Sequence, residues 1–388
     1  MIATPLLQRD VQQRDVAVHK HRPVPTARLR ARSSLAVRGA RWLLTAALLV
    51  FAGLLVYWAP AVTGTGWGEV GHTLQKVGAP WLVGLAVVWI AGLWSYAVVM
   101  TASLPGLSTR QALSLNLAGS AVANTLPLGG AISLGLVTAM SRSWGFSRSS
   151  ITTFLMLTNL WNVLIRVVFG ALSVAWFLTL GPGLVTGPAA LVIAGLAVAL
   201  IVAVGLVLMS DAALAWIGRS SAALVSAARS TFGRTEAVGP GRSYTDALLA
   251  LRFQLLTLLR ASWRRLTLGM IGYILLLALL LDLSLRGLGA PQSAMLMIAV
   301  VGIERLVTAL PITPGGAGAA ELSIVACLTA AGVSGVTALA AALLYRFYTF
   351  IAEFPVGAAV ALGWRISQSR QKARTAAVDG IPRIEQIA

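Results

Sequence analysis

The sequence predicts an all-α polytopic membrane protein, built on an inverted-topology repeat with two broken re-entrant helical hairpins. Hydrophobic residues make up 57% of its 388 residues and charged residues only 11%, which excludes an ordinary soluble domain. Two proline- and glycine-rich breaks, LPLGG (126–130) and ALPITPGGAGAAE (309–321), interrupt apolar regions in the two halves of the chain. Paired breaks of this kind are typical of transporter folds, in which interrupted helices form a site near the middle of the membrane.

Basic segments frame the apolar part of the chain. Residues 1–40 are polar and rich in arginine, and they lack the compact apolar core of a signal peptide. We interpret them as a disordered cytoplasmic arm, 41–365 as the transmembrane domain and 366–388 as a cytoplasmic tail. The net charge of +18 does not indicate nucleic-acid binding, because the lysines and arginines gather in the predicted cytoplasmic segments, as the positive-inside rule requires.

Six apolar segments are each long enough to cross a hydrocarbon core, which takes about 20 helical residues. We place these spans at 42–60, 81–101, 150–178, 187–209, 267–286 and 337–364. Two further apolar regions, 110–143 and 293–331, are each divided by one of the breaks. Because each half is too short to span comfortably, we expect re-entrant hairpins there.

The distribution of lysine and arginine predicts a location in the cytoplasmic membrane with both termini in the cytoplasm. Only Lys76 and Arg286 then lie on or beside the outer loops, which are 61–80, 179–186 and 287–292. The inner loop 211–265 contains a leucine-rich stretch, 245–265, with arginines along one face. We expect this stretch to form an amphipathic helix on the inner leaflet.

An offset of 187 residues relates the two halves of the chain and aligns the units 81–178 and 267–365. It superposes five pairs of residues: Pro127 on Pro314, Gly129 on Gly316, Gly145 on Gly332, Ser147 on Ser334, and Gly170 on Gly357. The first unit begins with a span that runs inward and the second with a span that runs outward, so the two units are predicted to have opposite orientations.

Ionisable residues inside the predicted spans are candidate substrate contacts, because charge at that depth is costly and is typical of functional sites. They are Arg166, Arg305, Arg346, Glu304, Glu321 and Glu353. Guanidinium groups bind phosphate well, and we expect Arg346 to be the main contact. The glutamates are suited to neutralise the arginines, accept protons or attract a cationic headgroup. The alternative is a closed network of buried ion pairs that only fixes helix packing.

The breaks themselves are candidate anion sites. Uncapped N–H groups at the start of a helix attract anions, and the helix dipole reinforces this attraction. The glycines and proline that supply such ends are Gly315, Gly316 and Gly318 in the second break and Pro127, Gly129 and Gly130 in the first. Asn124 and Tyr348 add polar side chains to the candidate site, although a membrane asparagine also commonly ties two helices together.

Motifs for catalysis and for metal binding are absent from the sequence. Metalloprotease, serine-elbow and Walker A patterns do not occur, and the only histidines are His19, His21 and His72. The sequence therefore predicts no enzyme activity, no metal and no cofactor.

These features resemble the flippase-like family named for the lysylphosphatidylglycerol synthase transmembrane region. The resemblance covers roughly 40–365 and is carried by LPLGG, Glu304 and Arg305, Pro311 to Glu321, Gly332, YRFYTF (345–350) and Gly357. In the multiple peptide resistance factors of that family, such a region moves aminoacylated phosphatidylglycerol between leaflets, and a separate cytosolic domain makes the lipid. We expect this chain to lack that synthase domain.

The resemblance implies a lipid translocase that moves a phospholipid or related amphiphile through a polar midplane cavity. Two alternatives are a carrier for polyprenyl-phosphate-linked sugars and a non-transporting scaffold for lipid- or wall-synthesis enzymes. The expected partners are membrane lipids, together with a second copy of the chain or a separately encoded lipid-modifying enzyme, and no nucleic acid.

Overall fold

A computed structural model of the chain describes residues 53–54, 57, 64–125, 129–179, 195, 244–309 and 316–379. The chain divides into two units, Met1–Leu44 and Thr45–Ala388, and every described residue belongs to the second. Several predicted features lie largely or wholly outside the described residues, namely the basic arm 1–40, the spans 42–60 and 187–209, and the end of the tail.

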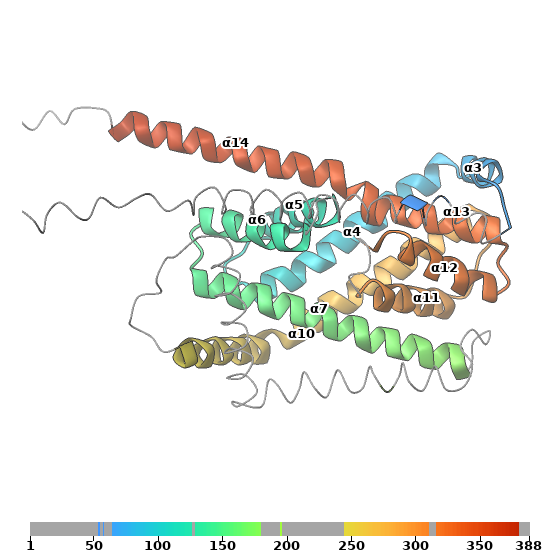
Figure 1. The fold of residues 1–388 in the computed structure, drawn as a ribbon, viewed down its shortest axis with the longest axis horizontal. Helices are drawn as coiled ribbons and strands as arrows, with labels where there is room; N and C mark the ends of the chain where they lie inside the picture. The colour runs from blue at the N-terminus through green and yellow to red at the C-terminus, as the bar shows by residue number, and fades with distance from the viewer. Residues whose placement is uncertain are drawn as a thin grey trace, which may run out of the picture. The chain divides into compact units, whose positions relative to one another are not determined.

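The regular structure of the described residues is helical, as the sequence predicts (Figure 1). Four helical segments are long and apolar enough to cross a membrane: Ala79–Ser103, Arg148–Phe177, Phe253–Gly287 and Gly335–Gln371. They match four of the six predicted spans, and the predicted class of polytopic helical membrane protein is therefore confirmed.

The predicted outer loop 61–80 contains a helix that the sequence analysis missed. This helix, α3 (Trp67–Gln75), has nine residues and packs against α13 (Gly335–Arg346). Val70 is its only buried residue. Trp67, Val70 and Leu74 have helical spacing, and Leu74 packs beside Val70 on the core, so a periodic signal was present but spans only nine residues.

The long helix α10 (Tyr244–Gly287) corrects the prediction of a separate amphipathic helix at 245–265. It runs without interruption through that stretch and through the predicted span 267–286. No proline or glycine occurs between Tyr244 and Leu268, so nothing in the sequence ends the helix at the expected boundary.

Each proline- and glycine-rich break lies between two short helices that pack against each other. Hairpin one consists of α5 (Thr109–Thr125) and α6 (Gly129–Ser143). Hairpin two consists of α11 (Ala294–Val307) and α12 (Ala319–Ala330). All four helices are shorter than the roughly 20 residues that a membrane crossing takes. Re-entry of each hairpin from one membrane face remains a prediction.

The last predicted span is a continuous helical segment with a change of geometry inside it. After α13, the chain forms the π-helix η2 (Phe347–Ile351) and continues as α14 (Glu353–Asp379). The π turn therefore separates Arg346 from Glu353, two of the predicted site residues. Short π segments inside helices are frequent at functional sites.

The order and packing of the helices agree with the 187-residue offset. Under this offset α4 (Ala79–Ser103) corresponds to the second part of α10, hairpin one to hairpin two, and α7 (Arg148–Thr179) to the α13–α14 segment. The first helix of each hairpin packs on the last helix of the other unit, so that α5 contacts α14 and α11 contacts α7. Reciprocal packing of this kind supports a two-fold relation between the units. Their opposite orientation in a membrane remains a prediction.

Equivalent glycines allow close approach in both of these helix pairs, α7 with α11 and α14 with α5. A Cβ atom on Gly170 would lie 2.7 Å from the Cβ of Leu306, where α7 meets α11. A Cβ atom on Gly357 would lie 2.1 Å from the carbonyl oxygen of Leu117, where α14 meets α5. The correspondence of Gly170 with Gly357 in the sequence thus has a packing reason in the structure.

Candidate functional site

A cavity of about 640 Å³ lies among hairpin one, α4, α7, α10 and the segments that carry the second-unit charges. Seven of the predicted site residues line it: Arg166, Arg305, Arg346, Glu353, Asn124, Gly130 and Gly316. Residues more than 200 positions apart in the sequence therefore meet at one polar cavity, within helices that are apolar enough to cross a membrane.

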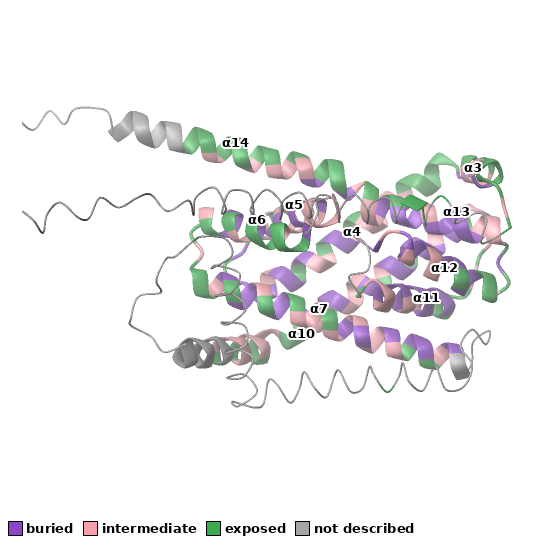
Figure 2. Cartoon of the chain, viewed as in Figure 1, coloured by how far each residue is buried: buried purple, intermediate pink, exposed green. Residues whose placement is uncertain are grey.

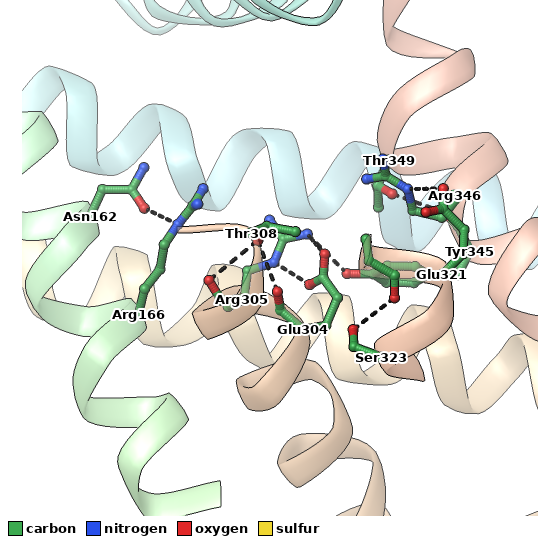
Figure 3. Close-up of polar contacts among 11 residues, drawn as sticks. Asn162, Arg166, Glu304, Arg305, Thr308, Glu321, Ser323, Tyr345, Arg346 and Thr349 are labelled. Carbon is green, nitrogen blue, oxygen red and sulfur yellow. Dashed lines mark hydrogen bonds and ion pairs between the residues drawn. The ribbon is translucent and has the colours of Figure 1, made fainter. Parts of the chain in front are cut away.

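Arg305 forms a buried ion pair with its neighbour Glu304 at the end of α11 (Figure 3). The Nε atom of Arg305 donates to Oε2 of Glu304 at 2.5 Å, and Nη2 donates to Oε1 at 2.8 Å. The same Nη2 atom lies 3.4 Å from the hydroxyl of Tyr345. Glu304 is fully buried behind the cavity wall, so it neutralises Arg305 from the protein side.

A second buried ion pair joins Arg346 to Glu321 on α12. The Nε atom of Arg346 donates to Oε1 of Glu321 at 2.9 Å, and its guanidinium lies 4.7 Å from the ring centre of Phe350. The other carboxylate oxygen of Glu321 accepts a hydrogen bond from the backbone N–H of Gly318 at 2.7 Å. This contact corrects the prediction of uncapped N–H groups at Gly318, because Glu321 already caps the start of α12.

Among the described residues, Arg166 has no carboxylate partner, unlike the other two arginines. Its Nε atom donates to Oδ1 of Asn162, one turn earlier on α7, at 2.7 Å. Across the parts of the chain that the structure describes, the ion pairs within the membrane domain involve Arg286, Arg305 and Arg346. Arg166 therefore presents to the cavity a positive charge that, among the described residues, is bonded to an amide and not to a carboxylate.

Figure 3 shows how these charges are arranged: Arg305 lies between Arg166 on one side and Arg346 on the other. Glu304 and Glu321 accompany the second and third arginines, whereas Asn162 accompanies the first. The uncompensated charge is thus at the α7 end of the row.

Glu353 connects hairpin one to the last span. The hydroxyl of Ser120 on α5 donates a hydrogen bond to Oε2 of Glu353, and the side-chain amide of Asn124 donates to Ser120 at 3.3 Å. Glu353 corresponds to Arg166 under the offset, and both line the cavity. Opposite charges therefore occupy equivalent positions in the two units.

The fold requires glycine at some positions of the breaks and not at others. Gly316 has φ +69°, and a Cβ atom there would lie 2.7 Å from Cγ2 of Thr308. A Cβ atom on Gly129 would lie 2.4 Å from the carbonyl oxygen of Ala123. The fold itself therefore requires glycine at both positions. A Cβ atom on Gly130 would meet nothing within 4 Å, although Gly130 lines the cavity.

Several predicted site residues are placed away from the cavity wall. The hydroxyl of Tyr348 donates to the carbonyl oxygen of Leu82 at 2.8 Å and ties η2 to α4. The others off the wall are Glu304, Glu321, Gly129 and Gly318. Pro127 and Gly315 lie outside the described residues.

Neutral polar residues of the wall were mostly missed by the sequence analysis. They include Tyr96, Asn116, Ser120, Ser133, Thr158 and Tyr273. A signal was available, because Asn116, Ser120 and Asn124 recur every fourth residue and so share one face of α5. Serine, threonine and asparagine often bond to the backbone of their own helix, which makes such a stripe easy to overlook.

The fold and the cavity define a polytopic helical membrane protein with a charged, polar cavity bordered by an interrupted helical hairpin. The family model described as the lysylphosphatidylglycerol synthase TM region matches residues 43–357. The chain belongs to this family, which confirms the resemblance seen in the sequence. No curated protein matches the chain.

Proposed function

We propose that the protein moves a phospholipid or related amphiphile between the leaflets of the cytoplasmic membrane. The headgroup enters the cavity while the acyl or prenyl chains remain in the bilayer. The observation that carries this proposal is a cavity of about 640 Å³ that presents three arginines among membrane-spanning helices. Membership of a family named for a lipid synthase region supports a lipid-related role.

The physical problem for such a transporter is the charge of the headgroup. A phosphate loses its hydration when it enters hydrocarbon, and this costs many kilocalories per mole unless other groups replace the water. Guanidinium, amide and hydroxyl groups on the cavity wall are suited to replace it.

Arg166 is the arginine best placed to hold the phosphate. Arg305 and Arg346 each share their charge with a buried glutamate, at 2.5 Å and 2.9 Å respectively. Arg166 donates to the amide oxygen of Asn162 and has no carboxylate partner among the described residues. The sequence analysis expected Arg346 to be the main substrate contact. Because Arg346 is ion-paired with Glu321, we now propose Arg166 in its place.

Filling the cavity without disturbing the fold tests the proposal. Gly130→Leu places a branched side chain at the cavity wall, where a Cβ atom meets nothing within 4 Å. Gly135 lies on the same helix, is equally unobstructed and does not line the cavity, so Gly135→Leu is the matched control.

The measurement is the transfer of fluorescent phosphatidylglycerol in vesicles that contain the purified protein. We expect transfer by the wild type and by Gly135→Leu, and a loss of transfer in Gly130→Leu with unchanged thermal stability. Absence of transfer by a folded wild type, or normal transfer by Gly130→Leu, would contradict the proposal.

We also propose that both termini face the cytoplasm, because lysines and arginines gather at the ends of the chain. Gly68 in α3 and Ser369 in α14 are exposed positions on opposite sides of this predicted arrangement. In a Cys327→Ala background, Gly68→Cys should react with an impermeant thiol reagent in intact cells. Ser369→Cys should react only after permeabilisation, and the reverse pattern would invert the topology.

A further inference from the structure

We propose that the transported amphiphile carries a phosphate attached to an uncharged headgroup that is rich in hydroxyls. Glycerol, inositol and sugar phosphates belong to this class, and headgroups that bear an ammonium do not. This inference rests on the proposed transport function and specifies the substrate of the same cavity.

The acidic groups of the cavity argue against a cationic headgroup. Glu353 is the one carboxylate among the described residues that line the cavity, and it already accepts a hydrogen bond from Ser120. Glu304 and Glu321 are held by Arg305 and Arg346 and lie off the wall. An ammonium group that leaves water needs a carboxylate partner, and the single carboxylate of this wall stands against three arginines, which repel a cation.

The neutral groups of the cavity form two polar stripes. Asn116, Ser120 and Asn124 follow one face of α5, and Thr158, Asn162 and Arg166 follow one face of α7, in each case with a spacing of four residues. Both stripes line the cavity. A phosphate bound at Arg166 would therefore lie at the end of a row of amides and hydroxyls.

Two of these neutral groups lack hydrogen-bond partners within the described residues. The hydroxyl of Thr158 is buried without a partner, and Thr158 as a whole is only 6% exposed. On the α5 stripe, Ser120 and Asn124 form side-chain hydrogen bonds, whereas the side-chain amide of Asn116 forms none with the described residues. A buried polar group without a partner destabilises a fold, so a ligand is the reason we assign to Thr158. Hydroxyls that both donate and accept are its natural complement.

Headgroup preference is the first test, and it uses dioctanoyl lipids with the purified full chain in detergent. We expect phosphatidylinositol to bind about tenfold more tightly than phosphatidylethanolamine, since several neutral hydrogen bonds distinguish them. Phosphatidic acid should fall between the two. Soluble inositol 1-phosphate should bind much more weakly than phosphatidylinositol, and equal binding would show that a free phosphate ester rather than a lipid is the ligand. Tighter or equal binding of phosphatidylethanolamine would overturn the inference.

A near-isosteric variant gives the second test. Thr158→Val removes the unpartnered hydroxyl, so we expect about fivefold weaker binding of phosphatidylinositol with no loss of thermal stability. The affinity for phosphatidic acid should not change. Thr152 is exposed on the same helix and bonds to its own backbone, so Thr152→Val is the control.

Unchanged phosphatidylinositol binding by Thr158→Val, or an equal loss for phosphatidic acid, would contradict the inference. The proposed function fails separately. If vesicle transfer persists without any headgroup preference, only this inference is wrong. If no lipid is transferred at all by the folded protein, the proposed function is wrong as well.

Discussion

The two hairpins have the same architecture and opposite chemistry. Hairpin two contains Glu304, Arg305 and Glu321, whereas the equivalent positions of hairpin one are Leu117, Ala118 and Leu134. Hairpin one instead contributes the amides and hydroxyls of the cavity wall. The same hairpin architecture thus supplies buried charges in one copy and neutral polar groups in the other.

The hairpins also differ in how firmly they are packed. Burial is concentrated on α11, α12 and α13, whereas α6 is largely exposed (Figure 2). Ile132 and Leu134 on α6 have exposed fractions of 45% and 44%. In a membrane such apolar surface faces lipid or a neighbouring protein. We infer that hairpin two is the fixed part of the site and hairpin one the adaptable part.

Loss of the Glu321 carboxylate should have the largest effect on stability. Glu321→Gln removes the carboxylate that pairs with the buried Arg346 guanidinium and weakens the cap at Gly318. Removal of one member of a buried ion pair costs about 3–5 kcal/mol, and we expect that destabilisation in denaturant or thermal unfolding.

The neutral wall supplies the contrast and the control for this prediction. Ser120→Ala should cost only about 1–3 kcal/mol, since it removes one hydrogen bond to Glu353. The double variant Glu321→Gln/Arg346→Gln should recover much of the lost stability. Equal effects of the two single variants would remove the distinction between a fixed and an adaptable hairpin.

The equivalent glycines should differ in a smaller but measurable way. Gly357→Ala brings a methyl group to 2.1 Å from the backbone oxygen of Leu117, and Gly170→Ala brings one to 2.7 Å from the side chain of Leu306. Because side chains yield more easily than backbone, we expect Gly357→Ala to be the more destabilising, within about 1–3 kcal/mol for overpacking. Thermal unfolding in detergent measures both, and a larger effect of Gly170→Ala would contradict this reading.

The smallest expected effect is a difference in local opening. Amide exchange followed by mass spectrometry should show faster exchange in α6 than in α12, because α6 has fewer buried contacts. Addition of phosphatidylglycerol should slow the exchange of α6 and leave α12 unchanged. Faster exchange in α12 than in α6 would show that hairpin two, and not hairpin one, is the adaptable part.

Much of this fold could be predicted from the sequence. Apolar length located the four described spans, and the offset between Gly129 and Gly316 matched the two hairpins, because both signals are local or periodic. The continuity of α10 at residues 245–267 was missed, since the change from an arginine-bearing to an apolar face resembles a boundary between two helices. The short helix α3 was missed although Trp67, Val70 and Leu74 have helical spacing, because a pattern over nine residues is too short to stand out in a predicted loop.

The site was predictable in its charges and not in its pairings. Arg166, Arg305, Arg346 and Glu353 were selected because charge is rare in such segments, and all four line the cavity. Sequence could not show that Glu321 rather than Glu353 pairs with Arg346, because that choice depends on how α12 packs against α13. Thr158 was missed because the lack of a hydrogen-bond partner for its hydroxyl, among the described residues, is visible only in the packed structure.

The central claim is that the guanidinium of Arg166, which has no carboxylate partner among the described residues, holds the lipid phosphate, and the transfer rate of Arg166→Gln tests it most directly. Arg148, exposed at the start of the same helix, provides the control variant Arg148→Gln. Loss of a charged contact worth about 1.5–3 kcal/mol predicts transfer slowed by at least about tenfold in Arg166→Gln. Its thermal stability should be equal or higher, because a half-buried charge that has no carboxylate partner among the described residues has been removed. Transfer of fluorescent phosphatidylglycerol at the wild-type rate by folded Arg166→Gln would contradict the account.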